Sequence, residues 1–465
     1  MSDSPPVPLR AAVVAVQLPG VDDQAFAASI AELRRLGRTL GVNVVATVTL
    51  RRKTMHPATL LGSGKLAELQ ALAGRTAAEI AGEEESDEVE ASGDGEDDDG
   101  SELDDPKVEL EAPDEAPGLA PIEAVLVDHD ISPSQARNLE KATRVEVLDR
   151  TAVILEIFRR HARSRAAKAQ VEIVRLQYMV PRLREQGKGK DRQRGGIGGK
   201  GAGESSLELD RRKIRDRIAE LTRELEAMAI EQQTQRARRR DMSRVALVGY
   251  TNAGKSTLMR ALTGSEVLVA DRLFATLDTT VRPLVPATRP RVLLSDTVGF
   301  IDKLPHGLVN SFKSTLDEAL EAGLLLQVVD ASDPNFERQL AVTTEVLAEI
   351  GAGDVPRLLL FNKIDRVGSP EAEAAATRAL TERWPDALVL SARRPDDVTK
   401  LHARLVSFFN RDLVEGEVHV PYDRQQLRGE IFASCEVLEE KYDDLGVIFR
   451  VRARPELLER LQATP

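Results

Sequence analysis

The sequence has little cysteine, histidine or continuous apolar character. Its 465 residues include one cysteine, Cys435, and six scattered histidines. A single cysteine excludes an internal disulfide and indicates a reducing compartment, and the histidines show no metal-site spacing with it. No apolar run approaches the ~18 residues needed to span a bilayer, and the first residues lack the basic and apolar blocks of a signal peptide. We therefore expect a cytoplasmic protein without a membrane span.

Aromatic residues make up only 3% of the chain, but the hydrophobic share of 42% still allows sizeable cores. The net charge is −12, and residues 83–115 contribute −17 of it, from 18 acidic residues against Lys107. Subtracting this −17 from −12 leaves the rest of the chain at +5. The acidic average therefore belongs to one insert and does not exclude a polyanionic partner. Residues 82–120 carry few large apolar side chains, which predicts a disordered insert.

The order of strand-like and helix-like segments predicts an α/β protein of several domains. Residues 1–150 alternate between the two patterns, which predicts a small α/β domain that contains the insert. The predicted strands are 12–16, 42–50, 124–127 and 145–148, and the predicted helices are 24–39, one that opens at 61–65, and 132–142 with Ser132 as its cap.

Residues 151–242 carry apolar side chains at helical intervals, which predicts two antiparallel helices joined by a basic, glycine-rich loop at 187–203. Residues 243–412 predict a domain with a mostly parallel sheet covered on both faces. Its predicted strands are 244–248, 292–295, 324–329, 357–361 and 387–390. Residues 413–465 predict a small α+β domain with helices at 426–440 and 455–462.

The run Gly249-Tyr-Thr-Asn-Ala-Gly-Lys-Ser-Thr257 fits the phosphate-binding pattern G-x-x-x-x-G-K-[ST] between a strand and a helix. Its glycines allow backbone N–H groups to surround an anion, and the helix N-terminus adds partial positive charge. We expect Lys255 to reach the β- and γ-phosphates and Ser256 to bind Mg²⁺. The predicted nucleotide-binding residues here are Gly249, Tyr250, Thr251, Asn252, Ala253, Gly254, Lys255, Ser256 and Thr257.

Further motifs follow in the order and spacing of a GTPase. In Asp296-Thr-Val-Gly299, Asp296 is expected to hold Mg²⁺ through a water, and the Gly299 N–H is expected to sense the γ-phosphate. Upstream, Thr280 is expected to close over Mg²⁺ when GTP is bound, as part of a switch. The predicted metal ligands are thus Ser256, Thr280 and Asp296, and the predicted catalytic groups are Lys255, Thr280 and Gly299.

Two later motifs predict recognition of guanine. In Asn362-Lys363-Ile-Asp365, the Asp365 carboxylate is expected to accept hydrogen bonds from the guanine N1–H and 2-amino group, which adenine does not present correctly. Ser391 and Ala392 are expected to offer backbone N–H groups to guanine O6. Each motif alone could be a turn or a helix cap, but their joint order and strand-end placement predict binding of GTP and GDP.

Two residues bear on hydrolysis. Phe300 stands where Ras-like enzymes have a water-orienting Gln, which predicts slow turnover that depends on a partner, unless another side chain supplies the function. Asn252 lies where some GTPases help to hold K⁺ near the phosphates, and the alternative is a loop-stabilising hydrogen bond.

The loop at 187–203 suits insertion into folded RNA, because it combines a flexible backbone with positive charge. The alternative is a solvated hairpin tip. The basic residues in and beside it are Arg182, Arg184, Lys188, Lys190, Arg192, Arg194 and Lys200. Leu61-Gly-Ser-Gly-Lys65 resembles part of a phosphate loop but lacks its spacing, so it is weak evidence for a second nucleotide site.

Over nearly its whole length outside the insert, the chain resembles the HflX family of ribosome-associated GTPases. The motifs that carry the resemblance are Gly62-Ser-Gly-Lys65, Asp149-Arg-Thr151, Gly195-Gly-Ile-Gly198, Gly203-Glu204, Leu207-Glu-Leu-Asp-Arg-Arg212, the phosphate loop, Phe274-Ala-Thr-Leu-Asp278 and Asp296-Thr-Val-Gly-Phe300. Phe300 matches the apolar residue that this family has in place of the catalytic Gln. Ala202 and Thr279 stand where the family usually has Pro, and Arg393 where Gln or Lys is commoner.

The resemblance implies that the N-terminal domain and the helical hairpin dock on the large ribosomal subunit and its rRNA, with the loop near the peptidyl-transferase region. It also implies that the GTP-bound form splits stalled ribosomes and that ribosome-stimulated hydrolysis permits release. We therefore expect a monomeric, Mg²⁺-dependent GTPase that splits or rescues stalled ribosomes. The alternative is a large-subunit assembly or silencing factor that uses GTP as a timer. An RNA-modifying GTPase is disfavoured because no second catalytic constellation is found.

Overall fold

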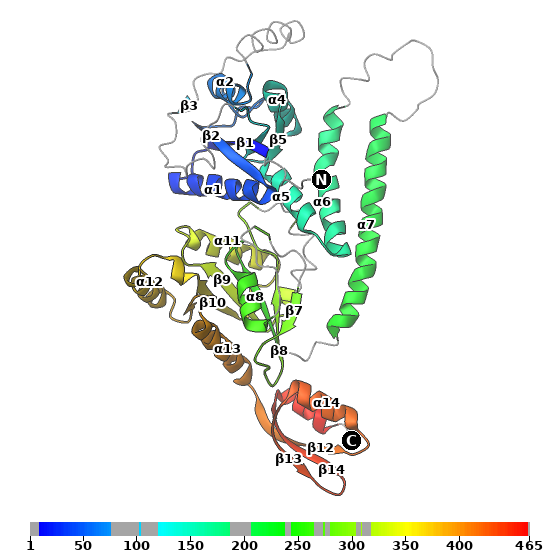
Figure 1. The fold of residues 1–465 in the computed structure, drawn as a ribbon. Helices are drawn as coiled ribbons and strands as arrows, with labels where there is room; N and C mark the ends of the chain where they lie inside the picture. The colour runs from blue at the N-terminus through cyan, green and yellow to red at the C-terminus, as the bar shows by residue number, and fades with distance from the viewer. Residues whose placement is uncertain are drawn as a thin grey trace, which may run out of the picture. The chain divides into compact units, whose positions relative to one another are not determined.

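The chain forms two compact units, Met1–Arg160 with Val171–Leu221 and His161–Gln170 with Thr222–Pro465 (Figure 1). The computed structural model describes residues 9–75, 102–103, 120–186, 206–237, 243–264, 273–274, 280–303, 308 and 318–463. The predicted basic loop at 187–203 lies outside these residues. So does nearly all of the predicted disordered insert at 82–120, although Glu102–Leu103 in it forms a short strand.

The first unit contains a five-stranded sheet of order β3-β2-β1-β4-β5, in which only β3 runs antiparallel to its neighbour. Its strands are β1 (Leu9–Gln17), β2 (Val42–Arg52), β3 (Glu102–Leu103), β4 (Ala124–Val127) and β5 (Glu146–Asp149). The helices around it are α1 (Asp23–Leu40), α2 (Ser63–Leu72), α4 (Pro133–Thr143) and α5 (Arg150–His161).

Helices cover both faces of this sheet, and apolar side chains on both faces of the central strands explain why. Leu69 of α2 and Leu139 of α4 share one core with Val14 and Val125. On α1, Gly37 lies so close to the sheet that an added Cβ would be 3.0 Å from Leu126. The prediction of an α/β arrangement is confirmed for these elements.

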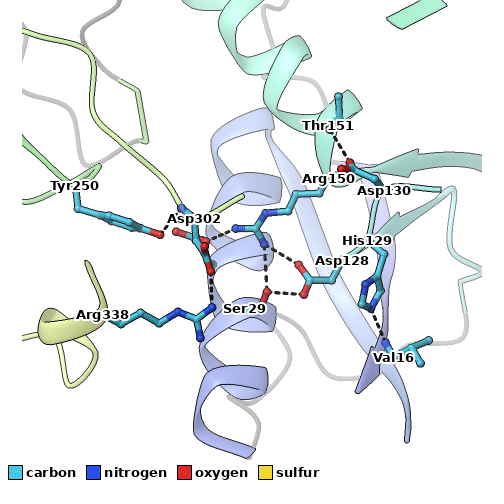
Figure 2. Close-up of polar contacts among 11 residues, drawn as sticks. Val16, Ser29, Asp128, His129, Asp130, Arg150, Thr151, Tyr250, Asp302 and Arg338 are labelled. Atoms are coloured by element: carbon cyan, nitrogen blue, oxygen red, sulfur yellow. Dashed lines mark hydrogen bonds and ion pairs between the residues drawn. The ribbon is translucent and has the colours of Figure 1, made fainter. Parts of the chain in front are cut away.

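A buried polar cluster lies just beyond the ends of β4 and β5 (Figure 2). The Arg150 guanidinium donates to Asp128 Oδ1 at 2.7 Å and pairs with the Glu32 carboxylate. The Ser29 hydroxyl donates to Asp128 Oδ2 at 2.6 Å. Since burying an isolated charge is costly, these partners allow Arg150 to lie in the interior.

The helical region contains a break that the sequence did not predict. After α5, a new helix α6 (Arg165–Gln186) begins beyond Ser164, whose hydroxyl accepts the Ala167 N–H at 3.0 Å and so satisfies a helix N-terminus. Helix α7 (Ser206–Ala237) runs antiparallel to α6, as predicted. The ion pairs of Arg165 with Glu224 and of Glu172 with Arg217 show this direction, since later residues of α6 meet earlier residues of α7.

Helix α6 is fastened to the sheet of the first unit at Asp149. This buried carboxylate accepts hydrogen bonds from the Tyr178 hydroxyl at 2.7 Å and from Arg182 at 2.6 Å. The Arg182 guanidinium also lies 3.5 Å from the centre of the Tyr178 ring, a cation–π contact. Burial raises the pKa of Asp149, although the hydrogen bonds and the charge of Arg182 oppose this effect.

In the second unit, a six-stranded sheet of order β11-β10-β9-β6-β8-β7 is parallel except for β7. Its strands are β6 (Ser243–Gly249), β7 (Thr280–Pro283), β8 (Val292–Asp296), β9 (Leu324–Asp330), β10 (Arg357–Asn362) and β11 (Leu388–Val389). Its helical elements are α8 (Lys255–Thr263), α11 (Phe336–Glu349), the 3₁₀ turn η2 (Ile364–Arg366), α12 (Pro370–Arg383) and α13 (Pro395–Asn410). Helices α8 and α13 pack on one face and α11 and α12 on the other, as predicted.

The last part of the chain is a three-stranded antiparallel sheet of order β12-β14-β13, with helices that pack against its core. Its elements are β12 (Val414–Pro421), α14 (Gln425–Ser434), β13 (Glu436–Tyr442), β14 (Gly446–Ala453) and α15 (Pro455–Gln462). The predicted helix at 426–440 is wrong in its second half, because residues 436–440 pair with β14. No helix in the described part of the chain is long and apolar enough to cross a bilayer.

Candidate nucleotide-binding site

The phosphate loop runs from the end of β6 to the start of α8, as predicted. Two positions in the loop require glycine. Gly249 has φ 149°, and Gly254 has φ 99° at the N-cap of α8. A Cβ at Gly254 would lie 2.2 Å from Asn362 Nδ2, so no larger residue fits there without displacing Asn362.

Lys255 is buried beneath the loop. Its Nζ donates to the carbonyl oxygens of Gly249 at 3.0 Å and Tyr250 at 2.7 Å. An ammonium group has three donors, so this geometry leaves a third N–H to meet a phosphate oxygen. Burial lowers the pKa of Lys255; the charge of Asp296 opposes this shift and that of Lys363 adds to it, and the pKa that results is about 8.

The three predicted metal ligands come together. The Ser256 hydroxyl donates to Asp296 Oδ2 at 3.0 Å, and Asp296 is fully buried. In the antiparallel register of β7 and β8, Thr280 is the direct partner of Asp296. Hydroxyl and carboxylate oxygens are the ligands that Mg²⁺ prefers, and Mg²⁺ keeps several ligands for waters and phosphate oxygens. This set therefore fits Mg²⁺. Residues 275–279, just before Thr280, lie outside the described part.

Residues 299–302 lie directly against the phosphate loop. The Thr251 N–H donates to Phe300 O at 2.7 Å, and the Phe300 N–H donates to Gly249 O at 3.1 Å. A Cβ on Gly299 would be 2.9 Å from Thr251 Cγ2 and 3.0 Å from Lys255 Nζ, so only glycine allows this approach. Phe300 is 2% exposed. Gly299 is therefore beside the Lys255 ammonium, and the Phe300 side chain is buried.

Asn362 joins the phosphate loop to the second guanine motif. Its Nδ2 donates to Ala253 O at 2.9 Å, and its Oδ1 accepts the Ala392 N–H at 3.0 Å. The Ser391 N–H donates to Asp397 Oδ2 at 3.0 Å. The backbone donors predicted for guanine O6 thus bond within the protein in this structure, and their contact with guanine stays a prediction.

Lys363 is held by a residue that the sequence reasoning missed. Its Nζ pairs with Asp330 Oδ2 at 2.7 Å, and Asp330 Oδ1 accepts hydrogen bonds from the Ser332 hydroxyl and N–H at 2.6 and 3.1 Å. Asp330 ends strand β9, and an acidic residue at the carboxyl end of a buried parallel strand was the available signal. Asp365 follows in η2 and is half-buried.

The remaining predicted residues lie in or next to the loop. Thr251 is buried, and Thr257 is half-buried in the first turn of α8. Asn252 has φ 60°, in the left-handed region that Asn adopts more readily than most residues, and its side chain is exposed. Whether Asn252 holds K⁺ stays a prediction.

Comparison with protein families gives three matches along the chain. The matching families are described as GTP-binding GTPase N-terminal, over residues 27–82 and 114–159, GTP-binding GTPase Middle Region, over residues 161–239, and 50S ribosome-binding GTPase, over residues 244–363. Together these matches cover most of the sequence.

Individual relatives match over almost the full length. The GTPase HflX of Gluconacetobacter diazotrophicus is 53% identical over 467 residues, which cover 99% of each chain. The GTPase HflX of Escherichia coli K12 is 34% identical over 427 residues, 90% of this chain and 88% of the relative. Among solved structures, a GTP-binding protein from Sulfolobus solfataricus in complex with GDP matches 85% of this chain and 100% of its own, at 22% identity and a TM-score of 0.41.

Proposed function

Because this chain belongs to the HflX family of GTPases, we propose that it binds the large ribosomal subunit and separates the subunits of stalled ribosomes. As a member, it is a GTP-hydrolysing P-loop enzyme, and membership supports a ribosome-associated role, with GTP and GDP as ligands and Mg²⁺ as the metal. The observation that carries the finer proposal is the basic, glycine-rich sequence at 187–203, which lies between two antiparallel helices that precede the GTPase domain in the sequence.

In this proposal the nucleotide site acts as a timed switch. Ser256, Thr280 and Asp296 would hold Mg²⁺, which when bound neutralises charge on the phosphate oxygens. Lys255 adds its own positive charge, and the Gly299 N–H distinguishes GTP from GDP because only GTP has a γ-phosphate. The protein would therefore hold its ribosome-binding state until hydrolysis removes that phosphate.

The burial of Phe300 supports a requirement for a partner in hydrolysis. A buried phenyl group cannot orient a water for attack on the γ-phosphate. Slow intrinsic turnover would keep the GTP form intact until the ribosome supplies or positions the missing group. The +5 charge outside the acidic insert suits an RNA partner, since phosphate contacts dominate affinity for nucleic acids.

The proposal is tested with purified ribosomes, stoichiometric protein and a non-hydrolysable GTP analogue, followed by sedimentation. We expect separated subunits. Ribosomes that stay associated would refute the splitting activity. Binding to free large subunits without splitting would favour the assembly or silencing role.

The role of residues 187–203 is tested by replacing them with a short Gly-Ser linker. We expect this variant to keep its intrinsic GTPase rate but to lose ribosome binding and ribosomal stimulation. A matched control replaces residues 83–100, the part of the acidic insert that precedes β3, with the same linker, and we expect stimulation to remain. Unchanged ribosome binding of the 187–203 variant would show that this loop is not the RNA contact.

Two finer points are also proposals. If Asn252 helps to hold K⁺, replacing K⁺ with Na⁺ in the buffer will slow GTP hydrolysis, and equal rates would refute a role for K⁺.

We also propose that the protein acts as a monomer. Sedimentation of the nucleotide-bound protein would distinguish a monomer from a dimer.

A further inference from the structure

A side-chain contact connects the phosphate loop to the segment after Gly299. Tyr250, the second residue of the loop, accepts the Asp302 backbone N–H on its hydroxyl oxygen at 2.7 Å. The Asp302 carboxylate in turn pairs with Arg338 of α11 at 2.6 Å (Figure 2). Tyr250 is 7% exposed, so its ring is packed and its hydroxyl has little freedom to move.

This contact completes a three-point attachment. The other two points are the main-chain hydrogen bonds of Phe300 with Thr251 and Gly249. Main-chain bonds form with almost any side chain at these positions, whereas the third point needs a hydroxyl at position 250. The side chain of Tyr250 therefore contributes to how firmly residues 299–302 are held against the loop.

We propose that Tyr250 is a positioning residue that sets the preference of the enzyme for GTP over GDP by holding Gly299 beside Lys255. The contact distances of Gly299 place its backbone next to Thr251 and the Lys255 ammonium, where a γ-phosphate would meet both. GDP has no γ-phosphate, so it has no group that would contact the Gly299 N–H. Loosening residues 299–302 therefore weakens binding of the triphosphate and leaves binding of the diphosphate unchanged.

The discriminating experiment measures the affinity of Tyr250→Phe for GDP and for a non-hydrolysable GTP analogue by calorimetry with Mg²⁺ and without ribosomes. Removing one neutral hydrogen bond should lower the affinity for the analogue roughly two- to tenfold and leave the affinity for GDP unchanged. Arg338→Gln should act in the same direction but by less, since this ion pair is partly exposed, at 42% and 21% for its two side chains.

Tyr422→Phe is the matched control. The Tyr422 hydroxyl donates to Asp443 O at 2.9 Å in the C-terminal sheet domain, so this variant also loses one tyrosine–backbone hydrogen bond. We expect it to leave both affinities unchanged. Equal weakening of GDP and the analogue by Tyr250→Phe would mean that Tyr250 only supports the fold of the loop. Tighter binding of the analogue would mean that the contact opposes the GTP state. Either result overturns the proposal, and neither depends on the ribosome.

Discussion

The lowered pKa of Lys255 predicts that nucleotide affinity falls at mildly alkaline pH. With a pKa of about 8 in the free protein, about nine-tenths of the Lys255 side chains are protonated at pH 7 and about one-quarter at pH 8.5. Phosphate oxygens bind the protonated form. If bound phosphates restore the pKa toward its ordinary value near 10, GDP affinity should fall about fourfold between pH 7 and 8.5.

The same shift predicts proton uptake. At a pH between the free and bound pKa values, binding of GDP raises the Lys255 pKa and the protein takes up a proton. We expect about 0.7 protons per GDP at pH 8.5 and about 0.1 at pH 7. Calorimetry in buffers that differ in ionisation enthalpy measures this number directly. The range stops at pH 8.5 so that guanine keeps its own N1 proton.

Two matched substitutions test whether Lys255 is the group that takes up the proton. Lys255→Met removes the titrating group, so at saturating GDP the proton uptake at pH 8.5 should disappear. Lys400→Met removes a lysine that is 77% exposed in the same domain, and the uptake should remain. A GDP affinity that stays constant from pH 7 to 8.5, with no proton uptake at either end, would refute a lowered Lys255 pKa.

Further predictions concern the geometry around the phosphates and the base. Gly254→Ala should lower the affinity for GDP at least about tenfold, because the new Cβ would collide with Asn362. Gly41→Ala has a similar positive φ of 78° and nothing within 4 Å, so it should lower the free energy of unfolding by roughly 1–2 kcal/mol while GDP affinity stays unchanged. Asp330→Asn removes the charged partner of Lys363 and should lower the affinities for GDP and for the GTP analogue equally, by roughly tenfold. A loss confined to the analogue would contradict this role, and calorimetry and thermal unfolding measure all three.

The sequence predicted the strand, the glycine turn and the helix of the phosphate loop, because consecutive residues carry this pattern. The phosphate loop is a strand, a glycine turn and a helix, and all three are local signals. The bridging contacts of Asn362 were not predictable in the same way, because Ala253 lies 109 positions away in the sequence. Asp330 was missed for a related reason, since a single acidic residue has no motif of its own.

The errors in secondary structure have a common physical cause. Residues 436–440 are Glu, Val, Leu, Glu and Glu, of which Leu and Glu favour helix. Pairing with β14 places them in a strand instead, because tertiary contacts outweigh a weak local preference. Strand β7 was not predicted either, and only its register with β8 brings Thr280 opposite Asp296.

The contacts of residues 149 and 150 have a consequence for how the chain can be divided. The sequence suggests a domain boundary at 150, but Asp149 is satisfied by α6 and Arg150 by residues of the preceding sheet domain. A fragment that ends at residue 150 would keep a buried carboxylate and lose the phenol and guanidinium that stabilise it. The smallest piece of the first unit that could fold alone should therefore extend through residue 182. For the same reason, we expect a chimaera that takes this sheet domain from a relative to need residues 150–182 from the same relative.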